Sequence, residues 1–137
     1  MLSQLVRLSF EKVMPTRTYT AIVLVGDGKR FAIYTDPSIG RSLQLHIIGT
    51  PKQRPLTHDL MDSVFRAMDI RILQVVIVDI QDTVYFARLF LEQNIGGIRH
   101  IAEIDARPSD CITLALMNNI PVYCTREVLD KTIPIEE

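Results

Sequence analysis

Residues 70–105 contain three consecutive β-strand patterns that are separated only by short turns. The stretch IRILQVVIVDI (70–80) is rich in β-branched residues, and after the turn QD the stretch TVYFARLFLEQ (83–93) has the same character. The turn NIGG then leads into IRHIAEID (98–105), where apolar residues recur at strand-like spacing. Strands joined by turns this short pair as antiparallel neighbours. The chain is therefore expected to form a three-stranded antiparallel meander.

The elements on either side of this meander complete a mixed pattern of strands and helices. Further strands are predicted over 2–13, 18–25, 30–35 and 120–124, and helices over 38–49, 58–68, 108–119 and 126–130. Such an order predicts an α+β fold, with a mixed, largely antiparallel sheet of hairpin and meander strands packed against helices. A length of 137 residues matches one domain, and we expect a single domain over 1–137.

The helix predicted over 58–68 has the pattern of an amphipathic element. Thr57 is the expected N-cap, and Asp59 in the first turn suits the positive end of the helix dipole. Apolar residues recur at i, i+3 and i+4, which predicts one buried stripe made of Leu60, Met61, Val64, Phe65 and Met68.

Composition narrows the classes of protein to which this chain could belong. The formal charge is −1 and the pI about 6.3, so no overall basic field would gather nucleic acid. Cys111 and Cys124 lack zinc-site spacing, and no signal peptide indicates an oxidising compartment. Apolar runs are too short to cross a bilayer. We expect a cytoplasmic protein with reduced thiols and no membrane partner.

The stretch IDARPSDCITLAL places unusual charge at the start of an apolar helix. Pro108 suits the first helical position, and Asp105 or Ser109 could accept the free helix N–H groups. Asp110 would favour the positive helix end, and Arg107 could pair with either aspartate. The same side chains suit a site, because carboxylates bind divalent metals and arginine binds phosphate. Spacing favours the capping interpretation without excluding the site.

A second group of polar residues lies in RPLTHD, which contains Arg54, His58 and Asp59. Adjacent residues on a helix diverge, so His58 and Asp59 are not expected to form a dyad with each other. His58 is interpreted as a neutral surface residue, a general base or a metal ligand. If this helix start meets the one at Pro108, Arg54, His58 and Asp59 share a cleft with the second group.

The two motifs, together with the meander between them, resemble the bifunctional nuclease domain family. RPLTHDL and IDARPSDCITLAL carry the resemblance, which extends from about Arg54 to Asp130. It implies a compact α+β fold, hydrolysis of phosphodiester bonds in both DNA and RNA, and a divalent metal such as Mg²⁺ or Mn²⁺. It also implies nucleic acid as a partner and a homo-oligomer, with a dimer favoured.

Within that resemblance each candidate residue acquires an expected role. Asp105 and Asp110 would hold the metal, and His58 would act as base or leaving-group acid beside the catalytic carboxylates of Asp59 and Asp110. Arg54, Arg107 and Ser109 would bind the substrate phosphate.

One segment departs from the family pattern. Where family members tend to read I-W-I-G-P-x-E-A, this chain reads IYTDPSIG, with Asp36 in place of glycine and Ile39 in place of glutamate. Asp36 is a candidate substitute for the missing carboxylate. The alternative function is a non-catalytic binding or regulatory module on the same fold, in which the motifs cap helices and bind an anion or a partner.

Overall fold

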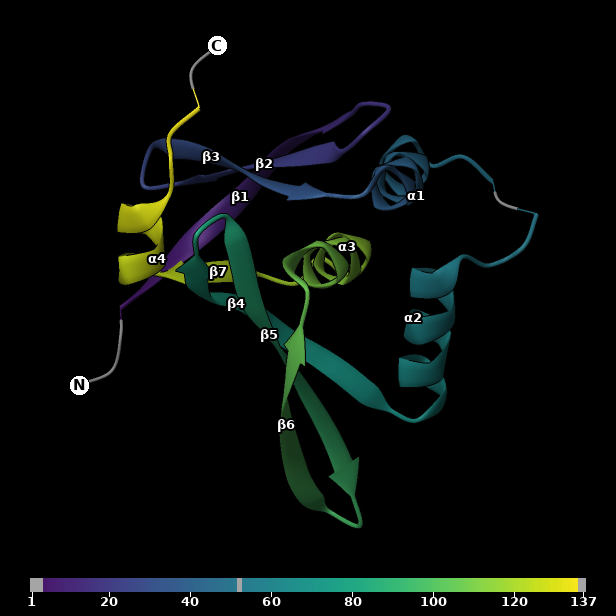
Figure 1. Cartoon of the computed structure of the whole chain (residues 1–137). Helices are drawn as coiled ribbons and strands as arrows, with labels where there is room; N and C mark the ends of the chain where they lie inside the picture. The colour runs from purple at the N-terminus through teal and green to yellow at the C-terminus, as the bar shows by residue number, and fades with distance from the viewer. Residues whose placement is uncertain (1–3, 52, 136–137) are drawn as a thin grey trace.

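The computed structural model describes residues 4–51 and 53–135 (Figure 1). Within these residues the chain forms an α+β fold, as predicted. The elements, in chain order, are β1 (Leu5–Pro15), β2 (Thr20–Gly26), β3 (Lys29–Thr35), α1 (Pro37–Ile48), α2 (Thr57–Ala67), β4 (Ile70–Gln81), β5 (Val84–Ile95), β6 (Ile98–Ala106), α3 (Pro108–Asn118), β7 (Val122–Thr125) and α4 (Arg126–Lys131).

The described strands form one seven-stranded sheet with the order β3-β2-β1-β7-β4-β5-β6. The predicted meander β4-β5-β6 is present and antiparallel, and the β4–β7 pair is parallel. Strand β1 joins the two halves of the sheet, because its first residues pair with β7 and its later residues with β2. The β1–β2 register shifts between Phe10 and Lys12, which is typical of a β-bulge that bends the strand.

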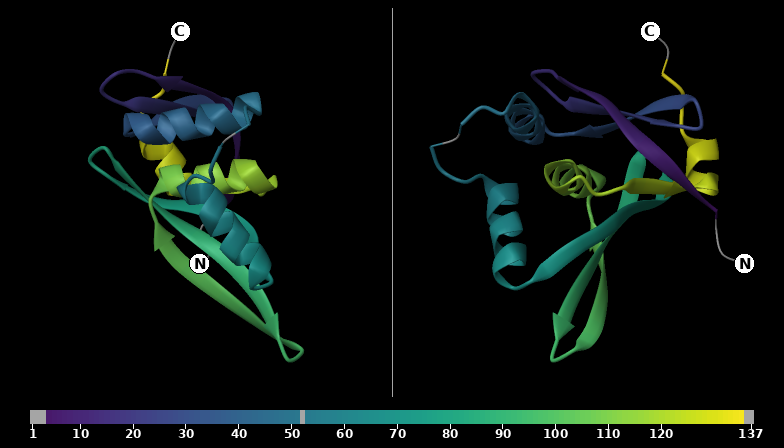
Figure 2. Two further views of the ribbon diagram at one scale, coloured as in Figure 1. Left: turned by 90° about the vertical axis from the view of Figure 1, so that its right-hand side faces the viewer. Right: turned by 180° about the vertical axis from the view of Figure 1, so that it is seen from behind.

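Helix α3 lies inside the bend of this sheet, between the β1-β2-β3 half and the β4-β5-β6 half (Figure 2). Residues 111–115, CITLA, are all buried, and they contact side chains from both halves of the sheet in one continuous core. A helix that is apolar on every side must be surrounded, because each face has to leave water. The apolar run after Asp110 therefore explains the central position of α3.

Helix α2 departs from the prediction. It begins at Thr57, but the N-cap is Leu56, whose N–H donates to Asp59 Oδ2 at 2.8 Å. The predicted buried stripe is wrong, since Leu60, Val64 and Met68 are exposed, whereas Met61 and Phe65 pack only against the margin of the core. The one buried residue of α2 is His58.

The β5-β6 hairpin extends away from the core as an arm (Figure 1). Every residue of β6 from Ile98 to Asp105 is exposed, including three isoleucines. Among the residues that the model describes, no helix is long and apolar enough to cross a membrane.

Candidate functional site

Three helix starts meet at one place in the molecule. Asp36 is the N-cap of α1, Arg107 is the N-cap of α3, and His58 lies in the first turn of α2. Arg107 Nη1 lies 3.8 Å from Asp36 Oδ2, and His58 Nε2 lies 2.9 Å from Asp110 Oδ1. The structure thus brings together the two motifs that lie about fifty residues apart, and adds Asp36 from a third segment.

Asp110 is the central acceptor of this cluster. Arg107 Nε donates to its Oδ2 at 2.9 Å, and Arg107 Nη2 donates to its Oδ1 at 3.3 Å. Burial opposes ionisation of this carboxyl, but the hydrogen bonds from Arg107 and His58 outweigh it, so the pKa of Asp110 lies below its ordinary value. An ionised carboxylate only accepts, and therefore His58 Nε2 carries the proton that joins the two residues.

His58 is almost fully enclosed, with 5% of its surface exposed. The space on its inner side is lined by Ser42, His46 and Thr113 and is too small for a substrate. His58 therefore contacts the site through Asp110, and its burial fixes where the Asp110 carboxylate points.

Arg107 is the most exposed member of the cluster, with 61% of its side chain accessible compared with 47% for Asp36. Its hydrogen bond to Asp110 is the main reason that its pKa is raised. Arg107 lines a pocket of about 430 Å³, together with Pro108, Ser109, Asp36 and Tyr34. No side-chain hydrogen bond caps the start of α3, so this helix presents its positive end to the same pocket. The arrangement suits an anion such as a phosphate group.

Two further predicted site residues lie in the segment that leads into α2. Arg54 is exposed in the loop before this helix. Asp59 accepts the Leu56 N–H and so stabilises the start of α2. Asp59 also lines the small cavity beside His58.

Asp105 and Ser109 flank the cluster without joining its hydrogen bonds. Asp105, near the end of β6, lies 3.0 Å from Arg88 Nη1 of β5. Ser109 is buried and its carbonyl accepts a 2.8 Å hydrogen bond from the Thr113 hydroxyl. Neither residue caps α3, so that part of the capping interpretation is wrong.

The side chains of the site, as they are arranged, do not form a coordination shell for a divalent metal. Both Asp110 oxygens already accept N–H groups, and the Arg107 guanidinium occupies the space between Asp110 and Asp36 that a cation would need. Asp105, the second expected ligand, is paired with Arg88. In the part of the chain that the structure describes, no group of three His, Cys, Asp or Glu side chains is placed to hold a metal.

Tyr34 is the residue of this pocket that sequence reasoning missed. It follows the buried Ile33 on β3 and is 62% exposed. The signal was present in the sequence, because side chains alternate along a strand, so Tyr34, two residues before Asp36, points outward when Ile33 is buried.

The cysteines offer no nucleophile. Cys111 and Cys124 are free and buried, and burial raises the pKa of Cys111 to about 12 and that of Cys124 to about 11. At neutral pH both are thiols, which are poor nucleophiles.

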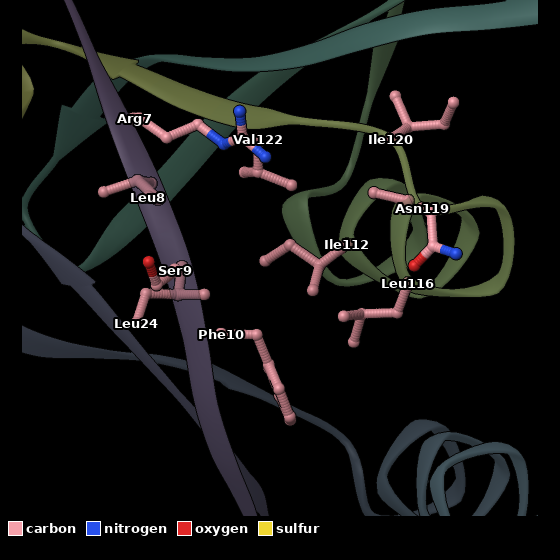
Figure 3. A pocket seen from close by; sticks show the side chains of 11 residues that line it. Arg7, Leu8, Ser9, Phe10, Leu24, Ile112, Leu116, Asn119, Ile120 and Val122 are labelled. Atoms are coloured by element: carbon pink, nitrogen blue, oxygen red, sulfur yellow. The ribbon is translucent and has the colours of Figure 1, made fainter.

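A second pocket, of about 440 Å³, opens where β1 and α3 diverge (Figure 3). Its walls are mainly apolar, from Phe10, Ile112 and Leu116, with Arg7 and Asn119 as polar members. None of the predicted site residues lines it, so it is separate from the Asp110 cluster.

Comparison with known proteins supports the family that the two motifs indicate. The model of the bifunctional nuclease domain family matches residues 22–136, which extends the similarity well beyond residue 54 towards the N-terminus. Two uncharacterized proteins of Mycobacterium tuberculosis, MT1877 of strain CDC 1551 / Oshkosh and Rv1829 of strain ATCC 25618 / H37Rv, are each 33% identical over 104 residues. The alignment covers 75% of this chain and 59% of each relative, so this chain corresponds to only part of their length.

Proposed function

The chain belongs to the bifunctional nuclease domain family, and from that premise we propose that it hydrolyses phosphodiester bonds of DNA and RNA where α1, α2 and α3 meet. One observation carries the proposal: the exposed Arg107 guanidinium lies at the start of α3, hydrogen-bonded to a carboxylate that a buried histidine orients. An arginine and an oriented carboxylate are the groups that phosphodiester hydrolysis uses to bind phosphate and to accept a proton.

In the proposed reaction the substrate phosphate competes with Asp110 for Arg107. As the guanidinium turns to the phosphate, the Asp110 carboxylate is left with the His58 hydrogen bond and becomes free to accept a proton. Water attacks phosphorus, its proton passes to Asp110, and the phosphorus–oxygen bond to the leaving nucleotide breaks. The leaving oxygen takes a proton from solvent. His58 is a positioning residue in this scheme.

The test is cleavage of end-labelled single-stranded DNA and RNA by purified protein. We expect Asp110→Asn to lower kcat/KM about a hundred-fold or more, the usual contribution of a general base. Arg107→Lys should also lose activity, because lysine keeps the charge but not the two-pronged geometry. The matched control is Asp130→Asn, which removes an exposed carboxylate from α4 and should cleave like the wild type.

The same assay tests metal dependence, which the family resemblance leads us to expect. Parallel reactions contain Mg²⁺, Mn²⁺ or EDTA. Cleavage that survives EDTA and is lost in Asp110→Asn supports the scheme above, whereas cleavage lost in EDTA places a metal in the reaction. Equal cleavage by wild type and Asp110→Asn would rule out this site.

A second candidate function is a non-catalytic module that binds nucleic acid or another anion. The observation in its favour is that Arg107 is held between two carboxylates, with Ile39 in place of the family's glutamate. Oligonucleotide binding without cleavage in any metal would favour this module.

We also propose that the protein assembles as a homo-oligomer through β6. This strand is at the edge of the sheet, and Ile98, Ile101 and Ile104 are exposed along it. An uncovered edge strand with apolar side chains is a template for pairing with another copy.

A further inference from the structure

The pocket at Arg107 has a neighbouring pocket of about 330 Å³ that shares Tyr34, Thr83 and Tyr85 with it and includes Lys131 and Ile133. The two pockets together are named the groove. The chain after α4 forms one wall, and the Ile135 N–H fixes it beside β3 by donating to the Arg30 carbonyl at 2.8 Å. The groove therefore extends from the proposed reaction centre, past two tyrosines, to a lysine.

Tyr34 is placed where a planar ligand could stack on its ring. It is 62% exposed, yet Tyr19 holds it in an edge-to-face contact, with the ring centroids 5.6 Å apart and an interplanar angle of 73°. Tyr85, which is half-buried, stacks on Phe31 with the centroids 6.1 Å apart and so forms a fixed floor. An exposed ring that is already held in place loses little entropy when a ligand stacks on it.

The order of the basic side chains along the groove, rather than its net charge, suits a nucleotide strand. Arg107 lies at one end and Lys131 at the other, with the exposed aromatic ring between them. This order suits phosphate, base and phosphate in succession, as in proteins that bind single strands without reading sequence. Asp36 and Asp82 also line the groove, so its binding relies on the ring as well as on charge.

We propose that Tyr34 is a stacking platform for a nucleobase next to the cleaved phosphate, and that the substrate class is therefore single-stranded DNA or RNA. This inference rests on the proposed function, because it assigns the phosphate to Arg107. The bases of a duplex already stack on each other, so Tyr34 has nothing to stack on until a strand is free.

The first experiment uses Tyr34→Trp as a reporter. The chain contains no tryptophan, so this variant carries a single indole at the groove. In EDTA, a twelve-nucleotide single strand should quench its fluorescence, and an abasic strand of the same length and charge should not. Tyr123→Trp is the matched control, because Tyr123 lies under Arg7 and outside the groove. Equal quenching by the abasic strand would overturn the proposal.

The second experiment measures affinity by fluorescence anisotropy with the same labelled strand. Tyr34→Ala should weaken binding about five- to a hundred-fold, and Tyr34→Phe should bind like the wild type because the ring is kept. Two phosphate contacts predict a slope of about −1.4 when log affinity is plotted against log salt.

The outcomes separate this inference from the proposed reaction. Quenching and ring-dependent binding without any cleavage would keep the base subsite and overturn hydrolysis. Cleavage that is indifferent to Tyr34→Ala would keep hydrolysis and overturn the subsite. A wild-type protein that binds no single strand would also overturn the subsite.

Discussion

Three aspartates that begin helices show how one side chain serves different purposes in this protein. Asp36 caps α1 by accepting the Ile39 N–H, and Asp59 accepts the Leu56 N–H before α2. Asp110 has the same first-turn position in α3, but its oxygens face Arg107 and His58 instead of the backbone. Because the backbone of α3 does not use Asp110, this carboxylate is able to hold Arg107 and His58 together.

The lowered pKa of Asp110 predicts an acid-dependent loss of stability at this residue. Its folded-state pKa lies below the ordinary value of about 3.9, so its contribution is complete above that pH and is lost as the pH falls through the folded-state pKa. At pH 6 we expect the free energy of unfolding of the wild type to exceed that of Asp110→Asn. The difference should be no more than about 1 kcal/mol, because the Arg107–Asp110 pair is partly exposed.

The measurement is thermal unfolding of both proteins at pH 6 and pH 3, followed by circular dichroism. The difference in Tm should shrink at pH 3. Other carboxyls with lowered pKa values, such as Glu11 and Glu92, have their partners outside the cluster, so their contributions are the same in both proteins and cancel. A difference in Tm that is the same at both pH values would contradict the lowered pKa of Asp110.

At the scale of elements, α1 approaches β2 so closely that only glycine fits between them. A Cβ on Gly40 would lie 2.1 Å from the Thr20 hydroxyl oxygen and 2.7 Å from its methyl carbon. Glycine lowers helix propensity, and that cost is offset here by the close packing of α1 on the sheet. The position of Asp36 depends on this packing, because Asp36 begins the same helix.

Gly40→Ala is therefore expected to destabilise the protein, even though alanine is the better helix former. Overpacking costs about 1–3 kcal/mol, with the upper end expected for a contact as short as 2.1 Å, and the propensity gain is about 1 kcal/mol, so we expect a net loss of up to about 2 kcal/mol in urea unfolding. Arg41→Ala, at the exposed next position, should change stability by less than about 0.5 kcal/mol.

Adding Thr20→Ala to Gly40→Ala should recover part of the loss, because the two positions are in contact. A Gly40→Ala protein as stable as the wild type would show that α1 can move away from β2 at no cost.

At the scale of the whole molecule, the projecting β5-β6 hairpin predicts association between copies of the chain. If copies pair through β6, wild type should be a dimer by light scattering at micromolar concentration, and Ile98→Lys should be a monomer. Ile48→Lys, which changes an equally exposed isoleucine on α1, should remain a dimer. A monomeric wild type would contradict the assembly.

The order and type of the elements could be read from the sequence, because local chemistry decides them. Turns of two to four residues force neighbouring strands to pair, as in 70–105, and proline with aspartate marks the starts of α1 and α3. The continuous apolar run after Asp110 likewise predicted a buried helix. The prediction of a buried stripe on α2 was wrong, because periodicity shows which residues share a face of the helix and not whether another element covers that face.

The candidate site could be predicted only as two separate motifs. The sequence by itself determined that Arg107 and Asp110 begin a buried helix and that His58 begins another. Only the tertiary structure decided that His58 contacts Asp110, that Asp36 reaches Arg107, and that Asp105 pairs with Arg88. The physical reason is range: caps, turns and strand pairing arise between near neighbours, whereas the meeting of three helix starts depends on how a bent sheet closes around α3.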